Sequence, residues 1–249
     1  MDVRFNEVST TPMSNTSRIV GGHETSIKEH PYQASMLFSF KDFTGYCSGF
    51  IINEDYVLTA AHCVYDATPS STVLRVGSTF RDNGTIVPVA ELTSHPDYNK
   101  IQYDSDVAVV RTEYAIVFSE TVQPIRLPPL GRQVVADTCV VVAGWGKTVH
   151  GEQSFSIALR EVKIPVVSNF KCFLSYFYTL TKNEFCAGNF YSGGMGACQG
   201  DSGSAAVQDG MAVGIVSYAR GCAPPLSPNV FADIAAESIR TFIYNETGL

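Results

Sequence analysis

The sequence lacks several features that would place it in particular classes of protein. No apolar stretch approaches the roughly 20 residues of a membrane span, and residues 1–18 are polar, without the apolar region of a secretory signal. Basic residues form no cluster: 17 Lys and Arg stand against 24 Asp and Glu, for a net charge of −7. From these absences we expect no membrane-spanning segment and no nucleic-acid partner.

Cysteine pairs with metal-ligand spacing are also absent, so we expect no zinc site, and nothing calls for a cofactor. The seven cysteines are an odd number, so at least one thiol is unpaired or bonds to another molecule. Disulfides form in the secretory compartment, and sequons at Asn15, Asn83 and Asn245 agree with that location. We expect a secreted protein whose signal peptide is not part of this sequence.

Apolar residues make up 45% of the chain and charged residues 16%, a globular composition long enough for one large domain or two packed halves. Short apolar runs rich in β-branched and aromatic residues alternate with Gly, Asn, Asp and Pro, which is typical of closed barrels or a sandwich. The strands are expected at 32–40, 49–52, 56–59, 73–77, 85–89, 106–110, 139–144, 160–165, 205–207 and 211–216.

Other segments depart from this β pattern. Gln208-Asp209-Gly210 predicts a hairpin turn, and the proline-rich stretch 123–129 an extended linker between two β halves. A short helix is expected over 168–177 with Ser168 as its cap, and an amphipathic helix over 232–244.

Residues 197–204 (ACQGDSGS) place Ser202 between glycines. A nucleophilic serine needs a neighbouring base and backbone N–H groups aimed at the developing oxyanion, and glycines permit such a turn. A plain turn explains the same residues. His62, just after a predicted strand, is a candidate base, although a lone histidine is more often structural. Asp106 leads into an apolar strand, where its buried carboxylate would need a partner such as an imidazole N–H.

With these residues in place, the chain resembles the chymotrypsin-like (trypsin-fold) serine proteases of family S1, of the type found as secreted zymogens in invertebrates. The resemblance covers residues 19–249, and His62, Asp106 and Ser202 follow one another at 44 and 96 positions. Six motifs occur in the family's order: Ile19-Val20-Gly21-Gly22, Thr59-Ala60-Ala61-His62-Cys63, Asp106-Val107-Ala108, Gly144-Trp145-Gly146, Gly200-Asp201-Ser202-Gly203 and Ser217-Tyr218-Ala219.

The resemblance implies an all-β fold of two packed six-stranded antiparallel β-barrels with a C-terminal helix. Residues 1–18 would be a propeptide, 19–122 the first barrel, 123–131 the crossover and 132–249 the second barrel and helix. Ser202 would be the nucleophile, His62 the general base and then acid, and Asp106 the residue that orients the imidazole. The N–H groups of Gly200 and Ser202 would form the oxyanion hole.

Activation in this family follows cleavage before the Ile-Val segment. Here it would follow Arg18 and free the amine of Ile19 to pair with Asp201. The implied disulfides are Cys47–Cys63, Cys172–Cys186 and Cys198–Cys222. They leave Cys139 as a buried free thiol, because the position of its usual partner is Gln208.

Specificity is where the chain departs from trypsin-like members, which carry an aspartate at the position of Gly196. With Ala197, Ser217, Tyr218, Ala219 and Asn229, Gly196 would form a neutral, narrowed pocket for small to medium apolar side chains. A chymotrypsin-like preference for aromatic or Leu side chains is the alternative, and a protease-fold binding protein with weak turnover is another. Ser204-Ala205 replaces the family's usual Gly-Pro. Segment 73–86 lacks the paired glutamates of calcium-binding members, so we expect no metal.

The expected partners are protein or peptide substrates, an activating trypsin-like protease and protein inhibitors. We expect the enzyme to be a monomer. Activation would need that separate protease because a neutral pocket would not accept Arg18.

Overall fold

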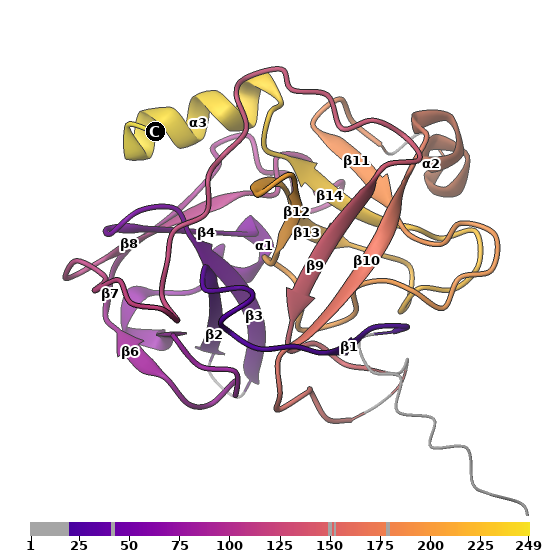
Figure 1. Ribbon diagram of the computed structural model, residues 1–249. Coiled ribbons are helices and arrows are strands. Elements are labelled where there is room, and N and C mark those ends of the chain that lie inside the picture. The colour runs from indigo at the N-terminus through magenta and orange to yellow at the C-terminus, as the bar shows by residue number, and fades with distance from the viewer. Residues whose placement is uncertain (1–19, 41–42, 149–150, 152, 178–179) are drawn as a thin grey trace, which may run out of the picture.

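Two β-barrels packed side by side form the molecule (Figure 1). The computed structural model describes residues 20–40, 43–148, 151, 153–177 and 180–249. The predicted fold class is confirmed: one six-stranded barrel is closed and the other nearly so, with few helices and one of them at the C-terminus.

The first barrel is a sheet in the order β6-β5-β2-β3-β4-β8-β7. Its edge strands β6 and β7 are separated by Pro88, which has no N–H for the strand ladder. They act as one interrupted strand that pairs with β5 on one side and β8 on the other, which almost closes the barrel. The strands are β2 (Gln33–Phe40), β3 (Phe43–Ile51), β4 (Tyr56–Thr59), β5 (Thr72–Val76), β6 (Thr85–Val87), β7 (Val89–Ser94) and β8 (Ala108–Thr112).

The second barrel follows the order β10-β11-β14-β13-β12-β9 and closes through pairing of β9 with β10. Its strands are β9 (Cys139–Gly144), β10 (Arg160–Val167), β11 (Glu184–Ala187), β12 (Ala205–Gln208), β13 (Met211–Tyr218) and β14 (Asn229–Asp233). The predicted hairpin joins β12 to β13 with positive φ at Asp209 (51°) and Gly210 (70°), as a two-residue hairpin turn favours.

Short β1 (His23–Glu24) pairs with β10, so these residues lie on the second barrel, although the predicted boundaries assign 19–122 to the first.

The linker segment 123–131 contacts both halves: the N–H of Ile125 donates to the carbonyl of Ile51, and the C=O of Arg126 accepts from the N–H of Ala212. The boundaries themselves stay a prediction.

Three α-helices and one short 3-10 helix are present among the described residues: α1 (Ala61–Val64), η1 (Pro69–Ser71), α2 (Asn169–Tyr176) and α3 (Glu237–Thr247). Ser168 caps α2 as predicted by accepting the N–H of Lys171 at 3.4 Å. The predicted start of the last helix at 232 is wrong, because Ala232 and Asp233 belong to β14 and pair with neighbouring strands.

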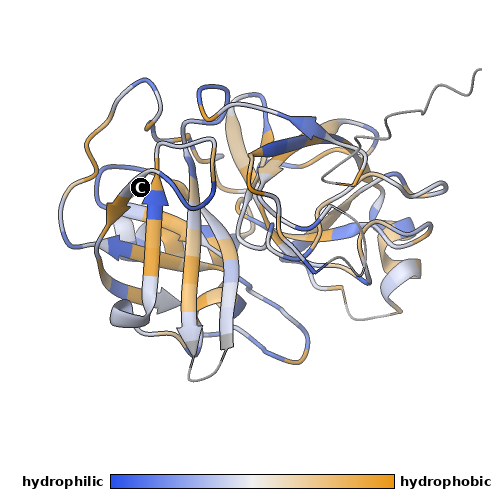
Figure 2. Ribbon diagram, turned by 90° about the horizontal axis from the view of Figure 1, so that it is seen from below, coloured by the Kyte–Doolittle hydropathy of each residue, from blue (hydrophilic) through white to orange (hydrophobic). Residues whose placement is uncertain are grey.

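Helix α3 packs against the first barrel, although it follows the second in sequence (Figure 1). Its buried residues Ile239, Phe242 and Ile243 belong to the same apolar core as Met36, Leu58 and other residues of that barrel. Apolar residues run along several strands in the hydropathy colouring of Figure 2. The chain end therefore ties the two barrels together, which helps to fix the cleft between them.

Three disulfides join the pairs that the resemblance implies: Cys47–Cys63, Cys172–Cys186 and Cys198–Cys222. Cys139 is free, but the expectation that it is buried is wrong, since this first residue of β9 is partly exposed. Gln208 lies beside it and donates through Nε2 to the Cys139 carbonyl at 3.1 Å and to Thr138 Oγ1 at 2.9 Å.

Candidate active site

His62 and Asp106 lie next to two paired strands of the first barrel. His62 is in α1, shortly after β4 ends at Thr59, and Asp106 lies two residues before β8 begins. Because β4 pairs with β8, the two segments meet at one edge of the barrel. Asp106 is fully buried. Its Oδ1 accepts the backbone N–H of His62 at 2.9 Å, and its Oδ2 lies 2.7 Å from His62 Nδ1.

This arrangement fixes the imidazole, because a carboxylate accepts and Nδ1 must therefore carry the hydrogen. The other ring nitrogen, Nε2, is left as an acceptor. Ser217 on β13 donates its hydroxyl to Asp106 Oδ2 at 2.5 Å, so the buried carboxylate is hydrogen-bonded from both barrels. A buried carboxylate without such donors would be strongly disfavoured.

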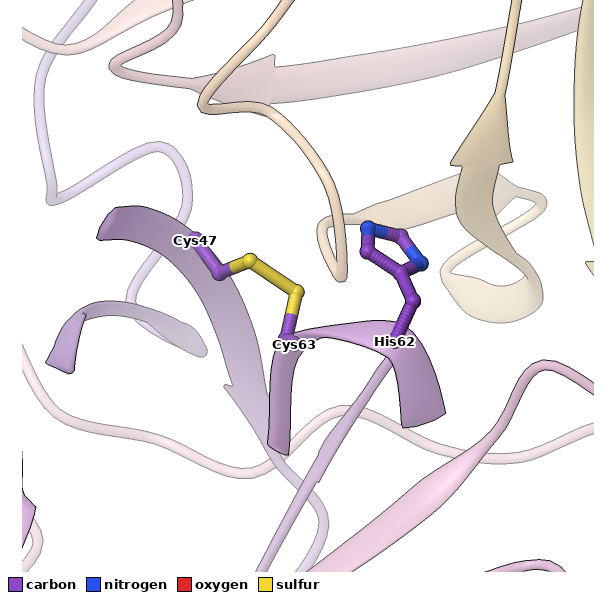
Figure 3. A group of neighbouring side chains, drawn as sticks. All are labelled: Cys47, His62 and Cys63. Atoms are coloured by element: carbon purple, nitrogen blue, oxygen red, sulfur yellow. A yellow bond between two sulfur atoms is a disulfide. The ribbon is translucent and has the colours of Figure 1, made fainter. Parts of the chain in front are cut away.

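The Cys47–Cys63 disulfide lies beside His62 and ties β3 to α1 (Figure 3). The two sulfurs and a ring nitrogen of His62 all lie within 4.8 Å of one another. They do not form a metal site, since both sulfurs are used by the disulfide. The disulfide instead anchors the short helix that carries the imidazole.

Ser202 lies in a tight turn between β-structure of both barrels. Gly200 and Gly203 have positive φ values of 95° and 84°, which favour glycine. The Ser202 carbonyl accepts the N–H of Ser48 on β3 at 2.7 Å, and a Cβ on Gly203 would lie 2.1 Å from the Ser48 carbonyl oxygen. The turn therefore packs directly against β3 of the first barrel. A side chain at position 203 would clash with β3 and displace the turn.

One pocket of about 210 Å³ brings His62 and Ser202 together. Among the predicted pocket residues, Ala197, Ser217, Tyr218, Ala219 and Asn229 line it, whereas Gly196 lies behind Asn229. The lining is completed by Tyr103, Cys198, Gln199, Val216 and Gly221, which sequence reasoning did not assign to the pocket. No carboxylate is among these described lining residues.

The N–H groups of Gly200 and Ser202 have no hydrogen-bond acceptor within the described part of the chain, while those of Asp201, Gly203 and Ser204 donate to backbone carbonyls. These two N–H groups lie near the Ser202 hydroxyl and have no acceptor among the described residues. They are therefore free to donate to an oxygen atom of a bound molecule. Such groups stabilise charge that develops on a carbonyl oxygen.

Comparison with known proteins agrees with this geometry. A family model described as Trypsin matches residues 19–243. Trypsin 5G1 of Aedes aegypti is 35% identical over 95% of this chain and 88% of that protein, and a trypsin of Phaedon cochleariae is 35% identical over 96% and 93%. The chain belongs to the trypsin family. It is therefore a serine endopeptidase, a hydrolase of peptide bonds.

A solved structure, that of the scabies mite inactivated protease paralogue S-D1, is also similar. It aligns with a TM-score of 0.80 and 30% identity, and covers 92% of this chain and 97% of the other. The described residues contain no helix that is long and apolar enough to cross a membrane.

Asp201 is the second buried carboxylate of this trypsin-family site. It accepts the N–H of Gly146 at 2.7 Å through Oδ1 and the N–H of Cys198 at 3.0 Å through Oδ2. It forms no ion pair within the described part of the chain, and burial raises its pKa from 3.8 to about 6 in spite of those two donors. Arg18 and Ile19, predicted to act with it, lie outside the described residues.

The chain just after Ile19 is nevertheless placed. Val20 pairs with Gly196, whose N–H donates to the Val20 carbonyl at 3.0 Å. A Cβ on Gly21 would lie 2.3 Å from the Gly194 carbonyl oxygen, and the φ of 74° at Gly21 also favours glycine. Residues 20 and 21 therefore contact the segment that leads into Asp201.

Asn229 lines the pocket and is bonded to Ala197, another lining residue. Its Oδ1 accepts the N–H of Ala197 at 2.9 Å, and its Nδ2 donates to the Ala197 carbonyl at 3.0 Å. A Cβ on Gly196 would lie 2.3 Å from the same Oδ1. The amide of Asn229 therefore occupies the space into which a side chain at position 196 would extend.

Ser204 is fully buried and accepts a hydrogen bond at 3.1 Å from Nε2 of Gln33, a buried residue on β2. Sequence reasoning missed Gln33, since no local pattern distinguishes it from other polar residues in a strand. The contact spans 171 positions of the sequence, so only the fold brings the two together.

Proposed function

We propose that Ser202, His62 and Asp106 carry out peptide-bond hydrolysis through an acyl-enzyme. Ser202 Oγ attacks the carbonyl carbon of the substrate as its proton passes to His62 Nε2. The imidazolium then gives that proton to the nitrogen of the departing amine, and a water molecule repeats the sequence to release the acid. The observation that carries this proposal is the His62 Nδ1–Asp106 Oδ2 contact of 2.7 Å, made by a histidine that lines the same pocket as Ser202.

The backbone N–H groups of Gly200 and Ser202 bind the oxyanion of the tetrahedral intermediate in this proposal. This role is supported by the observation that neither N–H group has a hydrogen-bond acceptor among the described residues. Loss of one donor of this kind typically raises the barrier by about 2.7–4 kcal/mol.

Cleavage after Arg18 activates the enzyme in our proposal. It creates an ammonium group at Ile19, one residue before Val20, which already contacts Gly196. That ammonium pairs with Asp201, whose buried carboxylate has no cation partner in the described residues. An unpaired buried carboxylate is costly, so the new pair stabilises the catalytic turn and the oxyanion donors beside it.

The pocket accepts small to medium apolar side chains before the cleaved bond in our proposal. Support comes from the Asn229 amide, which occupies the space beside Gly196, and from a lining without carboxylates among the described residues. A Lys or Arg side chain would enter without an opposite charge, which is unfavourable in a desolvated site. The relatives cited above are named trypsins, so this preference separates the chain from what their names suggest.

A panel of peptide substrates on protein cleaved after Arg18 tests the specificity. We expect the highest kcat/KM after Ala, Val or another small apolar residue. The runner-up is a preference for aromatic or Leu residues, and efficient cleavage after Arg or Lys would refute both. The same result would remove the inference that a separate trypsin-like protease must cleave after Arg18.

A second candidate is a protease-fold binding protein with weak turnover, favoured by the similarity to the inactivated mite paralogue. Labelling with an active-site phosphonate after Arg18 cleavage separates the two. Covalent modification of Ser202 supports the enzyme, and an unlabelled serine in folded, cleaved protein supports the binding protein.

The three disulfides support secretion, because such bonds persist in oxidising compartments. Protein substrates follow from the family. We propose in addition that the enzyme acts as a secreted monomer, controlled by its activating protease and by protein inhibitors.

A further inference from the structure

Two aromatic rings and two cationic side chains gather close to the catalytic turn. The rings of Tyr46 on β3 and Phe155 lie 4.9 Å apart. The Arg81 guanidinium lies 4.3 Å from the centre of the Tyr46 ring, and the Lys147 ammonium 5.4 Å from that of Phe155. All four residues are partly exposed, and we call this group the aromatic platform.

The aromatic platform borders the site on a different side from the pocket. Phe155 packs over Gly200, where an added Cβ would lie 2.7 Å from Phe155 Cδ1. Tyr46 directly precedes Cys47, whose sulfur lies within 4.8 Å of a ring nitrogen of His62 (Figure 3). None of the four platform residues lines the pocket that Ala197 and Asn229 help to form.

This position determines which part of a substrate the platform meets. In the proposed mechanism His62 gives its proton to the departing amine, so the chain that begins with this amine passes His62 and the neighbouring disulfide. Tyr46 and Phe155 lie beyond them. An extended chain advances about 3.3–3.6 Å per residue, so the first two residues after the cleaved bond come within reach of the platform.

The charge of the platform is only partly balanced. Arg81 donates to both carboxylate oxygens of Asp82, at 3.0 and 2.8 Å. Lys147 forms no ion pair with any residue that the structure describes, and its only charge-related contact there is with the Phe155 ring. Among the described residues, one positive charge therefore stands without a counterion beside the path of the substrate, in a chain whose net charge is −7.

We propose that the aromatic platform binds an acidic side chain, Asp or Glu, at one of the first two residues after the cleaved bond. Lys147 supplies the charge, and the two rings supply the apolar surface under the side-chain stem. The inference rests on the proposed function, because it requires the substrate chain to cross Ser202 in the direction that His62 sets.

The test uses internally quenched peptides that differ only in Glu or Gln at the first or second position after the cleaved bond. An exposed ion pair of this kind raises kcat/KM for Glu over Gln by about 1.5- to 5-fold. The ratio falls as salt is added, since added ions screen exposed charges. Lys147→Glu should reverse the preference, and Lys147→Gln should bring the ratio close to one.

Lys171→Glu is the matched control. Lys171 on α2 also lies over aromatic rings, 5.6 Å from Phe190 and 4.8 Å from Tyr191, and its substitution changes the net charge by the same amount. It should leave the Glu/Gln ratio unchanged. Cleavage of all peptides with a wild-type ratio of one, or a ratio that Lys147→Glu does not alter, overturns this inference alone. Cleavage of none overturns the proposed function and the inference together.

Discussion

Asp201 should make the stability of the uncleaved protein fall as the pH rises from 4 to 7.5. Burial raises the pKa of its carboxyl from 3.8 to about 6, so the folded chain retains a proton that the unfolded chain has already released. The stabilisation by Asp201 is complete below about pH 4 and is lost as the pH passes 6. The difference between the two pKa values corresponds to about 3 kcal/mol.

The Asp201→Asn variant isolates this contribution from other carboxyls with a raised pKa, such as Glu184, at about 7, and Asp233, at about 6. Urea unfolding of the parent and of the Asp201→Asn variant is compared across this pH range, both with Ser202→Ala to prevent self-digestion. The amide loses one of the two backbone hydrogen bonds, but this cost does not vary with pH. The stability of the variant relative to its parent should therefore rise by about 3 kcal/mol at most between pH 4 and 7.5.

Cleavage after Arg18 should remove this pH dependence above about pH 4. An ammonium of Ile19 beside Asp201 favours the charged carboxylate and lowers its pKa, so the folded chain no longer retains the proton between pH 4 and 6. If that pKa falls below 3.8, the stabilisation by the pair is present above about pH 4 and is lost only as the pH falls below it. A difference that stays flat before cleavage would refute the account of Asp201 as a buried, unpaired carboxylate. A slope of unchanged size after cleavage would refute its pairing with Ile19.

Three further outcomes follow from contacts in the site. Ser217→Ala removes the hydroxyl that donates to Asp106, and kcat/KM should fall about tenfold together with the thermal midpoint, because the buried carboxylate loses one of its donors. Asn229→Gly removes a side chain that lines the pocket, and in a peptide panel the preference should move toward larger apolar side chains before the cleaved bond. Ser204→Ala leaves the Gln33 amide without its acceptor and should lower the free energy of unfolding by about 1–3 kcal/mol, measured with urea.

The strands that the sequence predicts best are those whose local pattern matches their environment. β4 and β9 have the predicted bounds, 56–59 and 139–144, because each is a run of apolar residues bounded by turn residues. The end of β14 is instead predicted as the beginning of a helix. Its residues Ala232 and Asp233 suit either structure, and pairing with β11 and β13 decides between them.

The candidate site could also be predicted only in part. Ser202, His62 and Asp106 were found because each lies in a short motif that can be recognised in the sequence. The contacts that hold the site together were not predicted. Ser48 of the first barrel donates to the Ser202 carbonyl, and Asn229 bonds to Ala197, 32 positions away in the sequence. The first contact depends on how the two barrels pack and the second on how distant segments of the second barrel meet, and no periodicity in one segment encodes either.

Ser204 illustrates how a departure from a family pattern is resolved by packing. A side chain beside the catalytic turn would be expected to clash or to repack its surroundings. Its hydroxyl instead accepts from Gln33, while its N–H donates to the Asp201 carbonyl and its own carbonyl accepts from Val216.

The bonds to Gln33 and Val216 connect the turn to β2 of one barrel and to β13 of the other, and the bond to Asp201 lies within the turn. The seryl side chain thus adds a hydrogen bond between the barrels, and it does not line the pocket. Its presence is therefore no argument against turnover. The case for a weakly active protein rests on similarity alone, and phosphonate labelling of Ser202 addresses it directly.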